Sequence, residues 1–194
     1  MPPKGLLLII SGPSGVGKGS ICHLLLRRNP QLAYSVSATT RSPRQGEKEG
    51  VNYYFVDHKC FKSMIDQGEF LEWAEVYHNY YGTPRSTVEE LLSQGKDVIL
   101  EIDTQGAIQV KAACPEGIFI FILPPSYDEL KRRIVGRRSE DHHSLNCRLN
   151  SSTKEMDLAE QYDYTVINDD LEETVEEIEA IIKREKAKSC GKGD

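Results

Sequence analysis

Residues with the types and spacing to bind phosphate lie near the amino terminus, in the segment 12–20 (GPSGVGKGS). Glycines let the backbone curl so that successive N–H groups point at anionic oxygens, and Lys18 adds a full positive charge. The spacing G-x-x-x-x-G-K is that of a phosphate-binding loop, although Gly19 stands where Ser or Thr is usual and the hydroxyl comes one place later, at Ser20. The alternative is a plain glycine-rich turn.

The residues around this segment predict the elements that such a loop needs. Residues 6–10 (LLLII) form an apolar run that indicates a short buried strand, and residues 21–26 (ICHLLL) indicate a helix that ends before Asn29 and Pro30. A helix that starts directly after the loop adds partial positive charge to the site. This context favours a nucleoside triphosphate site over a plain turn.

A second anion site is indicated by Arg41 and Arg44, which lie three positions apart in a loop that Pro43 stiffens. Two guanidinium groups held close together suit one phosphate dianion. A solvated basic loop is the alternative, but the hydroxyl groups of Tyr53 and Tyr81 could complete a phosphate cage.

Glu72 is a lone carboxylate on an otherwise apolar stretch, 70–77 (FLEWAEVY), where it and Trp73 face opposite sides of a predicted strand. A buried carboxylate needs donors, and the N1–H and N2–H₂ edge of guanine offers two side by side. Adenine lacks that edge, so Glu72 would discriminate between the bases. An exposed glutamate on an edge strand is the alternative; the spacing to residues 81–83 (YGT) favours guanine.

Two further carboxylates, Glu101 and Asp103, end the predicted buried strand 97–103 (DVILEID). In a phosphate-loop enzyme an acid at this place holds Mg²⁺, usually through water. A purely structural role is the alternative.

Length and composition limit the class of protein. A chain of 194 residues can form one domain, or one core with insertions, and 24 basic against 30 acidic residues give a net charge of −6, which argues against a general nucleic-acid or membrane-surface binder. No apolar run is long enough to span a membrane, and no signal peptide is recognisable. The five cysteines are far apart, without a C-x-x-C pair, which predicts reduced thiols, no structural zinc site and a cytoplasmic location.

Alternating apolar strands and helical segments predict a three-layer α/β/α fold. Short strands at 34–38, 51–56 and 70–77 around one helix that Asp57 caps and Gly68 ends predict an inserted lobe. Capping boxes are predicted at Ser86 and Ser126, the second opening a helix with Lys131, Arg132 and Arg133 on its exposed side, and the tail after Lys186 is predicted to be disordered. The predicted division is a core of residues 1–35, 87–126 and 158–194, an acceptor lobe of residues 36–86, and a lid of residues 127–157.

Eight motifs together resemble the guanylate kinase family, over about residues 7–171. They are SGPSGVGK (11–18), SVSATTRSPR (35–44), G-x-x-Y (50–53), EFLEWA (69–74), NYYGT (79–83), EIDTQG (101–106), PPS (124–126) and INDDL (167–171). The resemblance implies a P-loop nucleoside monophosphate kinase that moves the γ-phosphoryl group of ATP, with Mg²⁺, to GMP or dGMP, giving ADP and GDP.

The resemblance also implies residue roles. The ATP phosphates would be held by Gly12, Pro13, Ser14, Gly15, Val16, Gly17, Lys18, Gly19 and Ser20, with Asn168 near the adenine. GMP would be held by Ser37, Arg41, Arg44, Tyr53, Glu72, Tyr81, Thr83 and Asp103. Catalytic charge would come from Lys18, Arg41, Arg137 and Arg148, while Glu101 would order Mg²⁺ through water. Arg138 and the pair His142 and His143 depart from the family pattern, as does Gly19.

There are two rival interpretations. The one from a different class is a guanylate-kinase-like interaction module that binds protein partners, and a nearer one is a kinase of the same fold that acts on another phosphorylated acceptor. Interaction modules generally lose part of the loop or the catalytic arginines, whereas Lys18, Arg41, Arg44 and Arg137 are all present. Glu72 and Ser37 argue against another acceptor. The expected partners are therefore ATP and GMP, without nucleic acid or membrane, for a monomer or homodimer.

Overall fold

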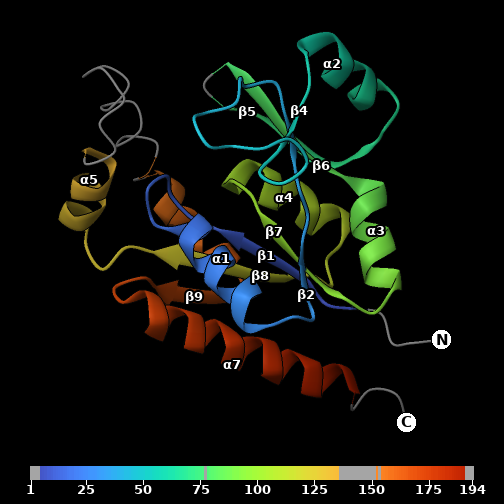
Figure 1. The fold of residues 1–194 in the computed structure, drawn as a ribbon. Helices are drawn as coiled ribbons and strands as arrows, with labels where there is room; N and C mark the ends of the chain where they lie inside the picture. Colours follow the sequence, from blue (N-terminus) through green and yellow to red (C-terminus); the bar gives the residue numbers. More distant parts are fainter. Residues whose placement is uncertain (1–4, 77, 136–151, 153, 191–194) are drawn as a thin grey trace. The chain divides into compact units, whose positions relative to one another are not determined.

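The computed structural model describes residues 5–76, 78–135, 152 and 154–190, and Figure 1 shows the order of their elements. The strands are β1 (Leu7–Ser11), β2 (Leu32–Tyr34), β3 (Ala38–Thr39), β4 (Tyr54–Phe55), β5 (Phe70–Val76), β6 (Asn79–Pro84), β7 (Asp97–Glu101), β8 (Ile118–Leu123) and β9 (Tyr164–Ile167). The helices are α1 (Lys18–Arg28), α2 (His58–Asp66), α3 (Arg85–Ser93), α4 (Thr104–Ala113), α5 (Tyr127–Val135), the 3₁₀ helix η1 (Asp157–Gln161) and α7 (Leu171–Cys190).

The larger sheet has the strand order β2-β7-β1-β8-β9. β2 pairs in parallel with β7, and β8 pairs in parallel with β9. Every residue of β1 and all but the last residue of β8 are buried, which is typical of parallel strands covered on both faces. The predicted α/β fold class is confirmed.

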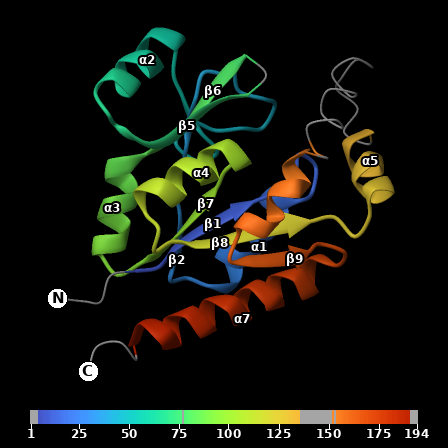
Figure 2. The ribbon, with the colours of Figure 1, turned by 180° about the vertical axis from the view of Figure 1, so that it is seen from behind.

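The chain forms two compact units, one of Met1–Ile9 with Gln31–Ile118 and one of Ile10–Pro30 with Phe119–Asp194. In the first unit a second sheet has the order β4-β3-β6-β5, with β5 and β6 antiparallel. Helix α2 lies beside this sheet (Figures 1 and 2). Phe61 joins the two, because its ring stacks on Phe70 at 4.4 Å and on Tyr80 at 5.4 Å between centroids. Asp57 caps α2 by accepting a hydrogen bond from the N–H of Cys60 at 2.7 Å, as predicted.

The prediction of one strand over residues 34–38 is wrong. β2 ends at Tyr34 in the larger sheet, and β3 begins at Ala38 in the smaller one. The alternation of residue types is continuous along this stretch, but the chain leaves one sheet for the other within it. The strand expected at 51–56 is likewise reduced to β4, and β6 was not predicted at all, because its Gly82 and Pro84 weaken the strand pattern.

The two predicted capping boxes have different outcomes. α3 begins at Arg85 after Pro84 and has no side-chain cap, so the box at Ser86 is wrong. At α5, Ser126 Oγ accepts a hydrogen bond from the N–H of Glu129 at 3.1 Å, as predicted. The Glu129 carboxylate does not return this contact, because arginines of its own helix occupy it.

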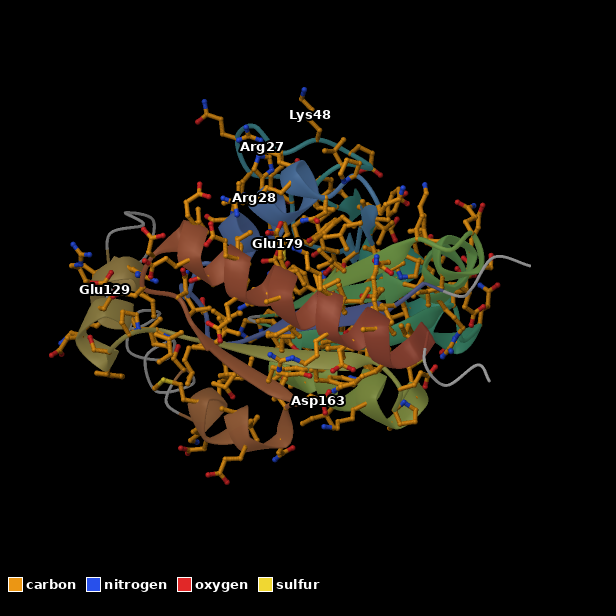
Figure 3. All side chains as sticks on the ribbon, turned by 90° about the horizontal axis from the view of Figure 1, so that it is seen from below. Arg27, Arg28, Lys48, Glu129, Asp163 and Glu179 are labelled. Carbon is orange, nitrogen blue, oxygen red and sulfur yellow. The ribbon has the colours of Figure 1, made fainter. Side chains whose placement is uncertain are left out.

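In the second unit α1 and α7 lie side by side, as Figures 1 and 2 both show. Arg28 at the end of α1 reaches the acidic face of α7, where it pairs with Glu172 and lies within 4 Å of Glu179 (Figure 3). α7 continues to Cys190, so the prediction of disorder after Lys186 is wrong over residues 187–190. An ion pair one turn apart, Lys188 with Glu185 at 2.6 Å, stabilises this last part of the helix. None of the helices in the described part of the chain has a stretch long and apolar enough to cross a membrane.

Candidate active site

The glycines of the phosphate loop have identifiable neighbours. Gly12 has φ +146°, and an added Cβ would lie 2.4 Å from the carbonyl oxygen of Ile122 in β8. Gly17 has φ +106°, and its Cβ would lie 2.5 Å from the side-chain nitrogen of Asn168. Positive φ combined with such close approach requires glycine at both positions. The loop therefore packs closely against Ile122 and Asn168, and these contacts fix its shape.

Lys18 is the first residue of α1, so its charge and the helix N-terminus act at the same place. Its Nζ donates to the carbonyl oxygens of Gly12 and Pro13, at 2.6 and 3.2 Å. The ammonium group thus folds back over the loop. Gly19 and Ser20, which follow it, are exposed, whereas Val16 is fully buried.

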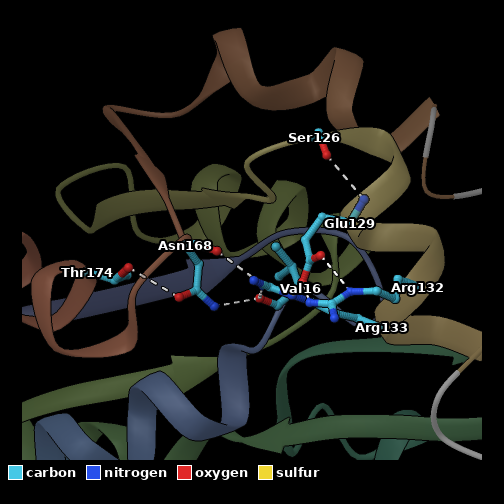
Figure 4. A network of polar contacts seen from close by, with 7 residues as sticks. All are labelled: Val16, Ser126, Glu129, Arg132, Arg133, Asn168 and Thr174. Atoms are coloured by element: carbon cyan, nitrogen blue, oxygen red, sulfur yellow. Dashed lines mark hydrogen bonds and ion pairs between the residues drawn. The ribbon is translucent and has the colours of Figure 1, made fainter.

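A polar network anchors the loop from outside (Figure 4). Asn168 is 6 % exposed, and its Nδ2 donates to the carbonyl oxygen of Val16 at 2.7 Å. Arg133 of α5 donates from Nη1 to the carbonyl oxygens of Val16 and Asn168, at 3.3 and 3.1 Å. Its Nε donates to Glu129 at 2.7 Å. These residues fix the loop backbone at Val16.

Arg133 was predicted to lie on the exposed side of α5, and this is wrong. Its side chain is 24 % exposed, whereas that of neighbouring Arg132 is 78 % exposed. Both arginines bind Glu129, and their hydrogen bonds, with that of Arg132 the stronger influence, lower the pKa of this carboxyl to about 2. In the sequence, charge alone could not distinguish Arg132 from Arg133.

The structure does not describe the predicted catalytic arginines of the lid, Arg137 and Arg148. The residues that depart from the family pattern there, Arg138, His142 and His143, also lie outside the described residues.

In the first unit the predicted phosphate cage is partly assembled. The rings of Tyr53 and Tyr81 meet edge to face at 5.9 Å, and the Arg41 guanidinium lies 5.4 Å from the centre of the Tyr53 ring. Burial, followed by the negative charge of Glu101, raises the pKa of Tyr53 to about 12, so its hydroxyl keeps its proton and can donate. The structure thus brings three of the four predicted phosphate ligands together.

Glu47 is a member of this cluster that the sequence did not reveal. Its carboxylate accepts from Arg41 Nη2 at 2.9 Å and from the backbone N–H of Arg44 at 2.7 Å. The hydrogen bond with Arg41 lowers the pKa of Glu47 below its usual range. A carboxylate three residues after the second arginine was a possible signal, because loop carboxylates often bond to nearby backbone N–H groups.

Glu72 has the predicted burial: its residue is 5 % exposed, whereas Trp73 is 37 % exposed. The hydroxyl of Thr83, itself fully buried, donates to Glu72 Oε1 at 2.5 Å. Burial is the main cause that raises the pKa of Glu72 to about 7, and the negative charge of Asp103 adds to it. The register explains the pairing, since Glu72 lies opposite Thr83 between β5 and β6.

The remaining predicted residues also lie in the first unit. Asp103 caps α4, where its Oδ1 accepts from the N–H of Gly106 at 2.8 Å. The carbonyl oxygen of Ser37 accepts from the N–H of Tyr54 at 2.9 Å. Glu101 is half-buried at the end of β7, with the hydroxyl of Tyr34 at 3.4 Å. No group of three or more metal-ligating side chains occurs among the residues that are described.

Known proteins resemble this chain over most of its length. The guanylate kinase family model matches residues 4–185. The chain is 52 % identical over 185 residues to a guanylate kinase of Clostridioides difficile (strain 630), covering 95 % of this chain and 90 % of that protein. It is 55 % identical to that of Clostridium tetani (strain Massachusetts / E88), covering 95 % and 88 %. The crystal structure of guanylate kinase from Anaplasma phagocytophilum matches with a TM-score of 0.80 at 37 % identity, covering 95 % and 87 %. The chain therefore belongs to the guanylate kinase family.

Proposed function

We propose that this protein is an ATP:GMP phosphotransferase that also accepts dGMP and yields ADP and GDP or dGDP. The observation that carries the guanine assignment is the buried carboxylate of Glu72, which is held by Thr83 on one oxygen. A carboxylate that takes two N–H donors from a planar base gains them only from guanine among the common nucleobases.

The acceptor phosphate would be held in the same unit by Arg41, Arg44, Tyr53 and Tyr81. Arg41 is oriented by Glu47 and by the Tyr53 ring, which reduces the side-chain entropy lost when a phosphate binds. Ser37 and Asp103 are proposed to complete the contacts to the base.

The donor triphosphate would be held by the loop 12–20. Lys18 would exchange its contacts with the loop carbonyl oxygens for phosphate oxygens and neutralise charge as the phosphoryl group moves. Asn168 is proposed to act near the adenine; its buried side chain already supports Val16, so its contribution to ATP would come through the backbone of this region. Arg137 and Arg148 remain predicted ligands of the triphosphate.

The chemistry requires little from the protein beyond position and charge. The phosphate of GMP is the nucleophile and is already ionised at neutral pH, so no strong base is needed. Lys18 and Arg41 would stabilise the charge on the transferred group in an in-line displacement. Mg²⁺, when bound with ATP, supplies further charge neutralisation, and Glu101 is the residue proposed to order its water ligands.

The test is an acceptor panel. The protein is mixed with ATP and Mg²⁺ and with GMP, dGMP, AMP, CMP or UMP in turn, and ADP formation is followed by a coupled assay. Rapid ADP formation with GMP and dGMP only is expected. Equal rates with AMP or UMP would overturn the guanine assignment, and no turnover with any acceptor would favour a non-catalytic interaction module.

Three further expectations accompany this proposal and need separate measurements. They are the division into a core, an acceptor lobe at 36–86 and a lid at 127–157; a monomeric or homodimeric state; and a cytoplasmic location.

A further inference from the structure

Helix α4 packs along the free edge of β5, which is the last strand of the smaller sheet. The side-chain amide of Gln109 makes the contact: its Nε2 donates to the carbonyl oxygen of Trp73 at 2.6 Å, and its Oε1 accepts from the N–H of Trp73 at 3.2 Å. One amide therefore satisfies both backbone groups that a further strand would otherwise pair. This fixes α4 beside Trp73, the residue next to Glu72.

Gly106 lies three residues before Gln109 and so on the same face of α4. An ideal Cβ on Gly106 would lie 2.4 Å from Glu72 Oε2, 3.0 Å from Cδ and 3.5 Å from Cγ. The first of these distances is shorter than any allowed contact, so an alanine here requires the carboxylate to move.

The reason for glycine at this position is specific. Gly106 lacks the positive φ that would itself demand glycine, and alanine is in general the better helix former. The three nearest atoms to its missing Cβ all belong to the side chain of Glu72, and none is backbone. The constraint is therefore the space for one carboxylate and not close approach of the helix to the sheet.

We propose that Gly106 and Gln109 are positioning residues for guanine recognition. Gln109 fixes α4 against β5, and the missing side chain of Gly106 leaves the space in which the Glu72 carboxylate is held, with Thr83 on its other oxygen. Neither residue touches the base. The inference rests on the proposed function, in which Glu72 reads guanine.

The test is a double-mutant cycle in the full-length protein with Gly106→Ala and Glu72→Asp. Gly106→Ala is expected to raise the KM for GMP about tenfold or more, with the KM for ATP unchanged. Glu72→Asp alone also raises the KM for GMP. In the double variant the shorter carboxylate is withdrawn from the new methyl group, so the two effects are expected to be far less than multiplicative. Ile108→Ala, on the exposed side of α4, is the matched control and should leave both KM values unchanged.

A second variant protects the test against poor folding of Gly106→Ala. Gln109→Leu keeps the size of the side chain and removes both bonds to Trp73; it is expected to raise the KM for GMP about threefold without changing that for ATP. Thermal unfolding with and without GMP should show a smaller GMP-induced shift for Gln109→Leu than for the wild type.

The outcomes separate the two proposals. A Gly106→Ala protein whose KM for GMP stays within twofold of the wild type, or whose effect multiplies fully with that of Glu72→Asp, would overturn the positioning role. Parallel rises in both KM values would overturn it as well, since they indicate general damage. A wild type that shows no preference for GMP, or a Glu72→Gln variant with unchanged KM for GMP, would instead overturn the proposed function.

Discussion

The loop at 12–20 and the cluster around Glu72 differ in how they are built. The loop is one contiguous segment that would bind phosphate with backbone N–H groups and one lysine, and three of its glycines, Gly12, Gly15 and Gly17, have positive φ. The Glu72 cluster combines residues of three separate elements, β5, β6 and α4. Under the proposed function, the first offers charge that any nucleoside triphosphate can use, whereas the second offers a shape and a pair of acceptor oxygens that fit guanine.

Their electrostatics differ in the same way. Around the loop, Lys18 and the start of α1 provide positive charge, and no acidic residue lies in the first turn of this helix. In the first unit Arg41 is paired with Glu47, whereas the pKa of the Glu72 carboxyl is raised by burial and, in addition, by the negative charge of Asp103. The loop therefore offers positive charge, and the first unit combines charges of both signs. Variants in the two regions should separate catalysis from selectivity.

The largest effect is expected in the loop. Lys18→Met should lower kcat about a thousandfold, because removing one charge aimed at the transferred group costs roughly 3–4 kcal/mol of transition-state stabilisation. Steady-state rates with saturating ATP and GMP measure this loss. Lys131→Met, an exposed lysine of α5, is the matched control and should retain wild-type kcat. A fall of less than tenfold for Lys18→Met would show that the loop lysine is not part of the chemistry.

Glu72→Gln should come next, and it should act on selectivity. The neutral amide can still bond to Thr83 but presents one acceptor where guanine needs two, so the KM for GMP should rise about 10- to 100-fold, on the order of 1–3 kcal/mol. The KM for ATP should not change. Glu75→Gln, an exposed change on the same strand, serves as the control. An unchanged KM for GMP would rule out contact between Glu72 and the base.

The raised pKa of Glu72 makes GMP binding dependent on pH. With a pKa of about 7, the carboxyl is mostly protonated at pH 6 and mostly ionised at pH 8, and only the ionised form accepts both N–H groups of guanine. The KM for GMP should therefore rise about tenfold as the pH falls from 8 to 6. The phosphate of GMP also titrates near pH 6. In the Glu72→Gln variant only the phosphate of GMP still titrates, so its pH profile measures the contribution of the phosphate alone. Identical pH profiles for the wild type and this variant would show that Glu72 does not titrate in this range.

Among the changes that compare the loop with the Glu72 cluster, the smallest effect is expected at the anchor of the loop. Arg133→Met removes the hydrogen bonds to the carbonyl oxygens of Val16 and Asn168, so the KM for ATP should rise about fivefold, near 1 kcal/mol, with that for GMP unchanged. Arg132→Met is a close control because Arg132 shares Glu129 but is exposed. Equal changes in the two variants would mean that the charge on α5, and not the contact with the loop, is what affects ATP.

The sequence alone determined the features that are local. The loop, its flanking strand and helix, and the caps at Asp57 and Ser126 depend on residues within a few positions of each other, and the structure confirms them. Local patterns suffice because glycine spacing, capping residues and strand alternation act through the backbone over one or two turns.

Only the tertiary structure decided which distant residues meet. The passage of the chain from β2 to β3, the ion pair of Glu47 with Arg41, the contact of Arg133 with Val16 and the space that Gly106 leaves for Glu72 all depend on such meetings. Arg133 and Arg132 are the same residue type in adjacent places, and the rotation of about 100° between neighbouring residues of a helix, not composition, separates their roles. Which of two chemically identical side chains binds the loop is decided by packing, because only the folded chain brings one of them into contact with it.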